Sequence, residues 1–239
     1  MKLAIITGGS KGLGKALVDI YANAHWQVVE FSRSGNSQNH QTCDFSEPDS
    51  CTDTLNKTFK QLSNNCYSEI VLINNVGTLA PVGPLQSTQP QDWQQNIQIN
   101  LNACVTTTGL FLKYFSKQDA NIKIANISSG AAVKPFYGWS LYCATKSAIE
   151  TFTSCIALET QNNKNLSIMT IRPGVIDTQM QQTIRDQDEA NFTDVAHFNA
   201  LKTDNKLQTP TIAAKKMIKL FSQSPLSGQV YDLNDVTLK

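Results

Sequence analysis

The sequence lacks the features that mark several classes of protein. Lys and Arg number 20 against 19 for Asp and Glu, and this formal net charge of +1 gives no electrostatic reason to expect nucleic-acid or membrane-surface binding. No apolar run approaches the ~20 residues that cross a bilayer. His25, His40 and His197 are scattered, with neither an HExxH motif nor a His–Cys cluster, so we expect no metal site.

The cysteines likewise form no framework, because none belongs to a CxxC pair. They are Cys43, Cys51, Cys66, Cys104, Cys143 and Cys155. Residues 1–7 have the composition of a buried strand and lead directly into Gly8, which is not the pattern of a signal peptide. We therefore expect a cytoplasmic protein whose cysteines are reduced thiols.

The composition is that of a globular protein, with 41% hydrophobic and 16% charged residues over 239 positions. Short β-branched apolar runs alternate with longer amphipathic segments, which is typical of βαβ units on a parallel sheet. The expected strands are residues 3–7, 27–31, 42–44, 70–73, 122–127, 167–171 and 229–233. The expected helices are residues 12–24, 48–62, 90–117 and 139–161.

These elements predict an α/β fold. With right-handed crossovers they form a single doubly wound Rossmann domain over residues 1–239, with a mostly seven-stranded parallel sheet and helices on both faces. Residues 177–209 differ, because they are polar, contain no predicted strand and carry isolated Met180, Phe192 and Phe198. We expect this segment to be a mobile cover over the ligand crevice, with core packing as the alternative for its apolar side chains.

A glycine-rich turn, TGGSKGLG at residues 7–14, follows the first predicted strand and opens the first helix. Its glycines permit a tight turn and let main-chain N–H groups approach a pyrophosphate at the positive end of the helix. The pattern from Gly9 to Lys15 also matches the GxxxxGK of a P-loop, but the next residue, Ala16, lacks the hydroxyl that would hold Mg²⁺. The turn therefore predicts a dinucleotide site.

The end of the second predicted strand indicates which dinucleotide is bound. Sites that prefer NAD carry Asp or Glu there, whereas this chain reads FSRS at residues 31–34. Arg33 and Lys11 could neutralise a 2′-phosphate, and Ser32 could donate a hydrogen bond to it. We therefore expect NADP(H), with two ordinary surface cations as the alternative interpretation.

Tyr142 and Lys146 lie four residues apart and would share one face of a helix. Because an ammonium group stabilises a phenolate, we expect Lys146, beside a positively charged nicotinamide, to lower the pKa of Tyr142. Ser129 follows a predicted strand, thirteen residues before Tyr142, where its hydroxyl can polarise a substrate carbonyl. Asn100 falls within a predicted helix, where asparagine is disfavoured unless its side chain forms a specific hydrogen bond.

Together these motifs resemble those of the short-chain dehydrogenase/reductase family over essentially the whole chain. TGGSKGLG is similar to the family's TGxxxGxG turn, and NNVG at residues 74–77 is similar to its NNAG strand end. Ser129, Tyr142 and Lys146 resemble the family's Ser–Tyr–Lys triad in spacing, and Asn100 resembles the fourth member. The resemblance implies that Asn100 positions a water that reprotonates Tyr142 through Lys146.

The resemblance also implies a set of cofactor-binding residues. Pro173-Gly174 followed by Thr178 is similar to the motif that contacts the nicotinamide carboxamide, and Asp44 is similar to an adenine-contacting Asp. The implied NADP(H)-binding residues are Gly8, Ser10, Lys11, Gly12, Leu13, Gly14, Ser32, Arg33, Asp44, Phe45, Asn75, Val76, Gly77, Tyr142, Lys146, Pro173, Gly174, Val175 and Thr178.

A narrower resemblance comes from PFYGWSLYCA at residues 135–144 and DTQMQQ at residues 177–182. Both are similar to the branch of the family that contains sepiapterin reductases and bacterial benzil reductases. In sepiapterin reductases an Asp near the last strand anchors the pterin, and Asp232 is in the matching place, although an ordinary exposed Asp is the alternative. The implied substrate-binding residues are Ser129, Tyr137, Trp139, Met180 and Asp232.

The resemblance implies NADPH-dependent reduction of a ketone or vicinal diketone, either a pterin side chain or an aromatic dicarbonyl, with Tyr142 as the proton donor. The aromatic residues before Tyr142 would form a wall for a planar substrate, with simple packing as the alternative. Two other functions stay open, a 3-oxoacyl thioester reductase and a non-enzymatic NADP(H)-binding redox sensor. The family further implies a homodimer or homotetramer, formed through the helices near residues 88–116 and 139–161.

Overall fold

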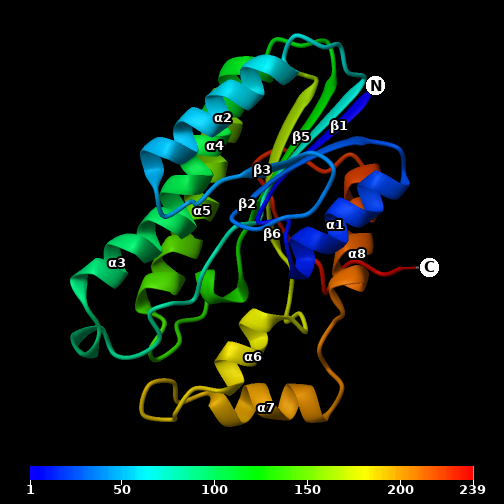
Figure 1. Ribbon diagram of the computed structural model, residues 1–239. Coiled ribbons are helices and arrows are strands. Elements are labelled where there is room, and N and C mark those ends of the chain that lie inside the picture. The colour runs from blue at the N-terminus through cyan, green and yellow to red at the C-terminus, as the bar shows by residue number, and fades with distance from the viewer. Residues whose placement is uncertain (239) are drawn as a thin grey trace.

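Seven parallel strands form one sheet in the order β3-β2-β1-β4-β5-β6-β7, in a computed structural model that describes residues 1–238 (Figure 1). The strands are β1 (Lys2–Thr7), β2 (Gln27–Ser32), β3 (His40–Thr42), β4 (Glu69–Asn74), β5 (Asn121–Ile127), β6 (Leu166–Arg172) and β7 (Val230–Asp232). All seven predicted strands are confirmed, with ends within two residues of those expected. The fold is the expected single Rossmann-like domain.

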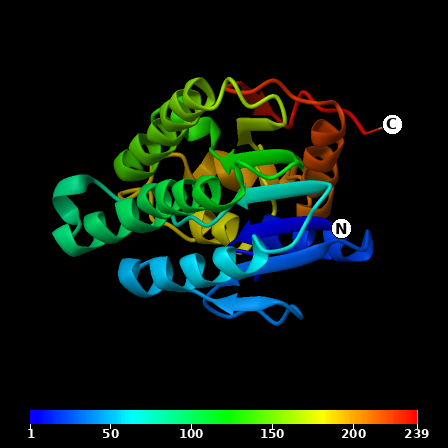
Figure 2. The ribbon, with the colours of Figure 1, turned by 90° about the horizontal axis from the view of Figure 1, so that it is seen from above.

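Helices cover both faces of this sheet (Figures 1 and 2). They are α1 (Gly12–Asn23), α2 (Pro48–Leu62), α3 (Pro90–Ile97), α4 (Ala103–Phe115), α5 (Ser140–Glu159), α6 (Gln179–Arg185), α7 (Val195–Thr203) and α8 (Pro210–Ser222). The helices α1 and α8 pack together on one face, while α2, α4 and α5 pack on the other. Helix α8 lies outside the helices expected from the sequence.

Strand β1 shows why the central strands read as continuous apolar runs. Leu3 and Ile5 belong to the core cluster under α2 and α4, whereas Ala4 and Ile6 belong to the cluster under α1 and α8. Because both faces of the parallel sheet are covered, every position of β1 after Lys2 is buried. Burial on both faces fixes the positions of the strands, so their carboxyl ends lie side by side along one edge of the sheet.

The segment expected as one helix over residues 90–117 is interrupted, so that expectation is wrong in detail. Helix α3 passes into a π-helical turn, Gln98–Asn102, before α4 begins. A π-helical turn inserts an extra residue into the helix and often marks a functional position. Asn100 lies in the middle of this turn.

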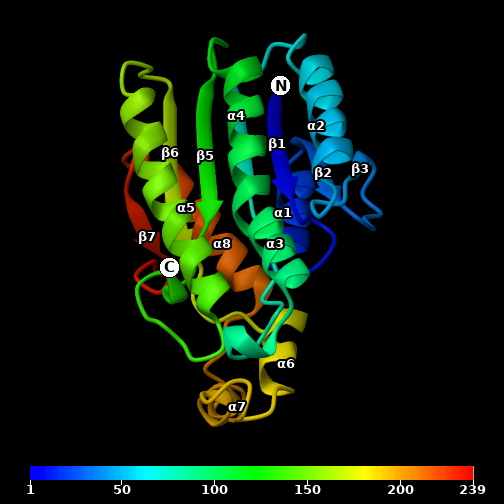
Figure 3. The same ribbon diagram turned by 90° about the vertical axis from the view of Figure 1, so that its left-hand side faces the viewer.

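Residues 177–209 form two short helices, α6 and α7, beyond the end of the sheet to which the strand arrows point (Figure 3). A parallel bridge between Ile176 and Gln208 closes the base of the segment. Phe192 and Phe198 are buried in a third apolar cluster with Trp139, and Met180 packs against it. The core-packing alternative is therefore confirmed for the two phenylalanines.

The expectation of six reduced cysteines is wrong for one pair. Cys43 and Cys51 form a disulfide, because the connection from β3 to α2 folds back and brings their Cα atoms to 5.3 Å. The other four cysteines are free. Within residues 1–238, no helix is both long and apolar enough to span a bilayer, and no three His, Cys, Asp or Glu side chains gather at one point.

Candidate active site

The glycine turn, residues 7–14, connects β1 to α1 at the edge of the sheet where the strands end. Gly8 and Gly12 have φ angles of +69° and +57°, a region that other residues rarely adopt. A Cβ on Gly14 would collide with the carbonyl oxygen of Gly8, so the turn closes only with glycine there. Helix α1 begins after Lys11 with no cap from a described side chain, which leaves its first N–H groups for an anion.

The NNVG segment at the end of β4 fixes the position of the glycine turn. The side-chain amide of Asn75 donates to the carbonyl oxygens of Thr7, at 3.2 Å, and Gly8, at 3.0 Å. In return the Thr7 hydroxyl accepts hydrogen bonds from the main-chain nitrogens of Asn75, at 3.0 Å, and Val76, at 3.2 Å. Both amide hydrogens of Asn75 are used in this way, so its side chain supports the turn.

The structure brings together Ser129, Tyr142 and Lys146. Ser129 follows β5 in an extended conformation, and its hydroxyl oxygen accepts a hydrogen bond from the main-chain nitrogen of Ala131 at 3.2 Å. Tyr142 and Lys146 lie in the first two turns of α5, both buried, with the Lys146 Nζ 5.6 Å from the centre of the Tyr142 ring. Lys146 donates to the carbonyl oxygen of Ile127 at 2.8 Å.

Burial determines the protonation of this group. It raises the pKa of Tyr142 to about 12, although the hydrogen bond with Ser129 acts in the opposite direction. Burial also lowers the pKa of Lys146 to about 8. The Lys146 ammonium points at the Ile127 carbonyl, and desolvation of the phenolate is the larger effect on the pKa of Tyr142. The expectation that Lys146 lowers this pKa beside a bound nicotinamide stays a prediction.

Asn100 is held by a closed set of hydrogen bonds. Its Oδ1 accepts from the main-chain nitrogen of Thr78 at 2.8 Å, while its Nδ2 donates to the Thr78 carbonyl oxygen at 2.9 Å and to Asn96 Oδ1 at 3.0 Å. These hydrogen bonds fix the Asn100 side chain within the helix, and its role in positioning a water stays a prediction. A Cβ on Gly77 would lie 3.2 Å from Asn100 Oδ1 and 3.6 Å from Lys146 Nζ, so the π-helical turn borders the triad.

A buried ladder of polar side chains joins the helices of the site to the sheet, and sequence reasoning missed it. Asn74 donates to Thr108 Oγ1 at 2.9 Å and to Asn126 Oδ1 at 2.8 Å. Asn126 in turn donates to Thr153 Oγ1 at 2.9 Å. The ladder runs through β4, α4, β5 and α5, and its only sequence signal is the repeated asparagine near the ends of β4 and β5.

The predicted adenosine-binding residues meet at the ends of β2 and β3. Burial raises the pKa of Asp44, but the Ser46 hydrogen bonds and the charge of Arg33 outweigh it, and the net shift is downward. Arg33 and Asp44 are therefore neighbours. Leu13 and Phe45 are buried in the core, so only their main-chain groups are available to a ligand.

A buried carboxylate lies beside these residues, and sequence reasoning missed it as well. Glu30, in the middle of β2, pairs with His40 in β3 and also accepts a hydrogen bond from Ser32. The signal was a charged residue inside the apolar strand sequence QVVEFS. The residues 31–34 contain no carboxylate, as expected, but Glu30 lies just before them.

Of the residues predicted to form an aromatic wall, Trp139 is buried and Tyr137 is exposed. Trp139 is only 4% exposed, and its ring stacks on Phe192 at a centroid distance of 4.5 Å. The same indole meets the Tyr142 ring edge-on at 5.7 Å. The packing alternative is therefore confirmed for Trp139. Tyr137 is 51% exposed and Met180 is half-buried, so both remain accessible to a ligand.

Asp232 belongs to a separate polar cluster at the end of β7. Its Oδ1 accepts from the main-chain nitrogen of Asn234 at 2.8 Å, and its charge contributes to a raised pKa of Arg172, after the larger effect of the Glu150 hydrogen bond. Arg172 itself forms a two-point contact with Glu150, at 2.8 and 2.7 Å.

The segment after β6 approaches the glycine turn. Thr178 caps α6 through Gln181, and a Cβ on Gly12 would lie 3.2 Å from the Thr178 methyl group. Gly174 has a φ of +75°, and a Cβ there would lie 2.8 Å from Gln208 Nε2. Thr178, at the start of α6, therefore lies against the glycine turn, and the PG motif precedes it in the same segment.

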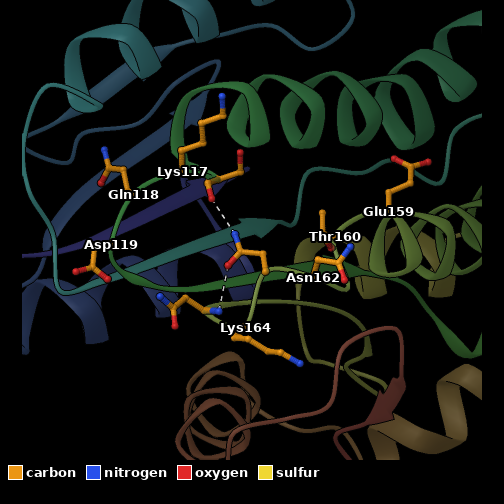
Figure 4. Close-up of a pocket in the computed structure, with 10 residues that line it drawn as sticks. Lys117, Gln118, Asp119, Glu159, Thr160, Asn162 and Lys164 are labelled. Carbon is orange, nitrogen blue, oxygen red and sulfur yellow. Dashed lines mark hydrogen bonds between the residues drawn. The ribbon is translucent and has the colours of Figure 1, made fainter.

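A polar depression of about 660 Å³ lies at the other end of the strands, between the last turns of α4 and α5 (Figure 4). Lys117, Asp119 and Glu159 border it, and Asn163 Nδ2 donates to the Ser116 carbonyl oxygen at 2.8 Å within it. None of its described lining residues is a predicted site residue. The predicted chemistry therefore belongs to the opposite edge of the sheet.

Comparison with known proteins gives matches along nearly the whole chain. Residues 2–189 match the family model described as short chain dehydrogenase. A benzil reductase ((S)-benzoin forming) from Bacillus cereus is 34% identical over 249 residues, covering 98% of this chain and 100% of that protein. One from Bacillus subtilis (strain 168) is 30% identical over 241 residues, covering 98% and 99%. The crystal structure of the KRED1-Pglu enzyme has a TM-score of 0.82 and 26% identity, covering 97% of this chain and 100% of that one.

The family model covers most of the chain and the curated relatives cover almost all of it. The chain belongs to the short-chain dehydrogenase family and is an oxidoreductase.

Proposed function

We propose that this oxidoreductase uses NADPH to reduce an aromatic vicinal diketone, such as benzil, to a hydroxy ketone. The observation that carries the proposal is the meeting of Ser129, Tyr142 and Lys146 at the strand ends, beside a glycine turn. The two bacterial relatives named benzil reductase support the diketone over other ketones. In this reaction a hydride adds to one carbonyl carbon and a proton adds to its oxygen.

The chain offers a fitting site for the dinucleotide. A side chain at Gly14 would collide with the Gly8 carbonyl oxygen, so glycine at this position keeps the turn tight. No described side chain caps the start of α1, so its first N–H groups are available to a pyrophosphate. When bound, NADPH supplies the hydride. Lys146 would hold the nicotinamide ribose, and Lys11, Arg33 and Ser32 would hold the 2′-phosphate.

Tyr142 acts as the acid in this proposal. With a pKa of about 12, its phenol is neutral at physiological pH and can donate a proton to the substrate oxygen. The Ser129 hydroxyl donates a hydrogen bond to the same oxygen and stabilises the charge that develops there. Lys146, with a pKa of about 8, is protonated at neutral pH and relays a proton back to Tyr142. A water at Asn100 would form its hydrogen bond with a main-chain group, because both hydrogens of the Asn100 side-chain amide already donate to Thr78 and Asn96.

Residues 177–209 would cover the substrate in this proposal, with Met180 and Tyr137 at its border. A pterin is the less favoured substrate, because Asp232 lies in the cluster with Arg172 and Asn234. A diketone needs no such anchor. The aromatic cluster around Trp139 would then contribute indirectly, by holding the ring of Tyr142 in position.

NADPH oxidation with a panel of carbonyl compounds tests the proposal. The panel contains benzil, sepiapterin, a small aliphatic diketone and a 3-oxoacyl thioester, each with NADPH and with NADH. We expect the highest kcat/KM with benzil and NADPH, and benzoin as the product. A higher kcat/KM with sepiapterin or the thioester, or no turnover with any of the four, would contradict the proposal.

We also propose a homodimer formed through α4 and α5. Val105 on α4 and Leu158 on α5 are exposed apolar side chains, and the interface would cover them. Light scattering of the purified protein should give twice the mass of one chain. A mass of one chain at micromolar concentration would contradict this assembly.

A further inference from the structure

We propose that Glu30 and His40 form a buried pair that sets the discrimination between NADPH and NADH. The proposal rests on the proposed function, because it concerns the subsite assigned there to the 2′-phosphate. Four residues surround the Glu30 carboxylate: the main chain of Gly9 and Gly35 packs against it, and Ser32 and His40 form hydrogen bonds with it. Neither Glu30 nor His40 belongs to the residues that sequence reasoning assigned to the cofactor.

The Glu30 carboxylate is buried without a full set of partners. The side chain is 1% exposed. Its Oε1 lies 2.7 Å from His40 Nδ1 and 3.3 Å from the Ser32 hydroxyl. Its Oε2 is buried, and no described residue donates a hydrogen bond to it. A buried carboxylate is unfavourable for folding, and an apolar residue would suit this strand position, so its presence calls for a functional reason.

The carboxylate lies next to the glycine turn and to the loop after β2. A Cβ on Gly9, within the glycine turn, would lie 2.9 Å from Glu30 Oε2. A Cβ on Gly35, in the loop after β2, would collide with Oε1. Two glycines thus make room for one carboxylate, between the turn that would hold the pyrophosphate and the loop that carries Arg33. The proposed 2′-phosphate subsite lies between the same two segments.

His40 controls how much of this negative charge the subsite experiences. The main-chain nitrogen of Gly35 donates to His40 Nε2 at 3.3 Å, which assigns the proton of the ring to Nδ1, facing Glu30 Oε1. His40 therefore donates to the carboxylate and also supports the loop after β2. The Ser32 hydroxyl also donates to Oε1, at 3.3 Å. Without His40 it is the described donor left to that oxygen, so it is less available to a phosphate.

The consequence is a difference between the two cofactors. A 2′-phosphate is an anion, so a carboxylate that contacts Ser32, a residue assigned to that phosphate, repels it, and the hydrogen bond from His40 weakens that repulsion. The 2′-hydroxyl of NADH carries no charge and is not repelled. A purely structural role of the pair would instead affect both cofactors equally.

The test measures kcat/KM for NADPH and NADH in four proteins, the wild type, Glu30→Gln, His40→Gln and the double variant. We expect Glu30→Gln to raise the NADPH:NADH ratio by about five-fold, as removal of one nearby charge predicts. His40→Gln should lower the ratio by a similar factor. In the double variant the loss should disappear, because no carboxylate is left to repel the phosphate. Equal changes for both cofactors, or an unchanged ratio, would overturn the proposal.

The matched control is Glu69→Gln, which removes a carboxylate paired with Lys123 at the far end of the strands. It should leave the ratio unchanged. Competition between 2′,5′-ADP and 5′-AMP gives a second readout that needs no turnover, so the result stands even if the proposed carbonyl substrates fail. Glu30→Gln should tighten the binding of 2′,5′-ADP relative to 5′-AMP, and the uncharged Glu30→Met replaces it if the Gln variant does not fold. No change in relative binding would overturn the proposal.

Discussion

At the scale of single residues, burial moves the two ionisable groups of the triad in opposite directions. It favours the neutral phenol of Tyr142 and disfavours the ammonium of Lys146, because each charged form loses contact with water. A neutral phenol is a proton donor, as reduction requires. This arrangement buries the Lys146 ammonium, which lowers the free energy of unfolding of the protein.

Replacing Lys146 by Met should stabilise the protein at neutral pH. The pKa of Lys146 falls from 10.5 in the unfolded chain to about 8 in the folded one, so between these values the unfolded chain binds more protons and stability rises with pH. Below pH 8 the lysine therefore costs ~3 kcal/mol. Urea unfolding of Lys146→Met and wild type at pH 7 should show this difference, and at pH 10.5 it should vanish. An equal difference at both pH values would contradict the assignment.

The members of the triad were predicted from their spacing together with the resemblance to the family. Ser129 follows a strand, and Tyr142 and Lys146 share a helix face, so local structure brings the last two together. The direction of the Tyr142 pKa shift could not be predicted, because it depends on which groups surround the phenol in three dimensions. Glu30 was missed for the same reason, since only the pairing of β2 with β3 places His40 beside it.

At the scale of elements, the ladder of buried side chains joins the helices of the site to the sheet. Asn126 is its centre, because it accepts from Asn74 in β4 and donates to Thr153 in α5. The position of α5 relative to β5 decides whether Tyr142 meets Ser129. The ladder therefore couples stability to catalytic geometry.

Asn126→Leu should destabilise the protein by ~2–3 kcal/mol, because the substitution leaves buried polar groups on Asn74 and Thr153 without one partner each. Chemical denaturation measures the loss. The matched control is Asn64→Leu at an exposed position, for which we expect a change within ~0.5 kcal/mol. Similar effects of both substitutions would mean that the ladder does not hold α5 in place.

The strands could be predicted from the sequence because both faces of the sheet are covered, so each reads as a short apolar run. The π-helical turn at Gln98–Asn102 could not be predicted, because Asn100 within it is held by Thr78, a residue 22 positions away in the sequence. Helix α8 carried readable signals, with Pro210 in its first turn and a cap from Thr209. Both signals lie where residues 177–209 end, at Thr209 and Pro210.

At the scale of the whole molecule, one aromatic cluster connects the segment of residues 177–209 to the catalytic helix. Trp139 stacks on Phe192 from that segment and meets the ring of Tyr142 at the start of α5. The position of the segment and the position of the phenol therefore depend on the same side chain. The sequence indicated the location of the segment but not this packing.

Trp139→Ala should remove this connection. We expect a loss of ~3–5 kcal/mol in the free energy of unfolding, because the indole is buried and its removal leaves a cavity. Limited proteolysis should then cut within residues 177–209 faster than in the wild type. Tyr137→Ala, at an exposed neighbouring position, is the control and should change neither property. A protected segment in Trp139→Ala would show that other contacts hold it.

The central claim is that Tyr142 donates the proton in carbonyl reduction, and Tyr142→Phe tests it most directly. The variant keeps the ring and its packing against Trp139 and removes only the hydroxyl. Steady-state turnover with NADPH and benzil, measured beside the dissociation constant of NADPH, should show at least a ~100-fold loss of kcat with unchanged cofactor binding. A kcat close to that of the wild type would contradict the account.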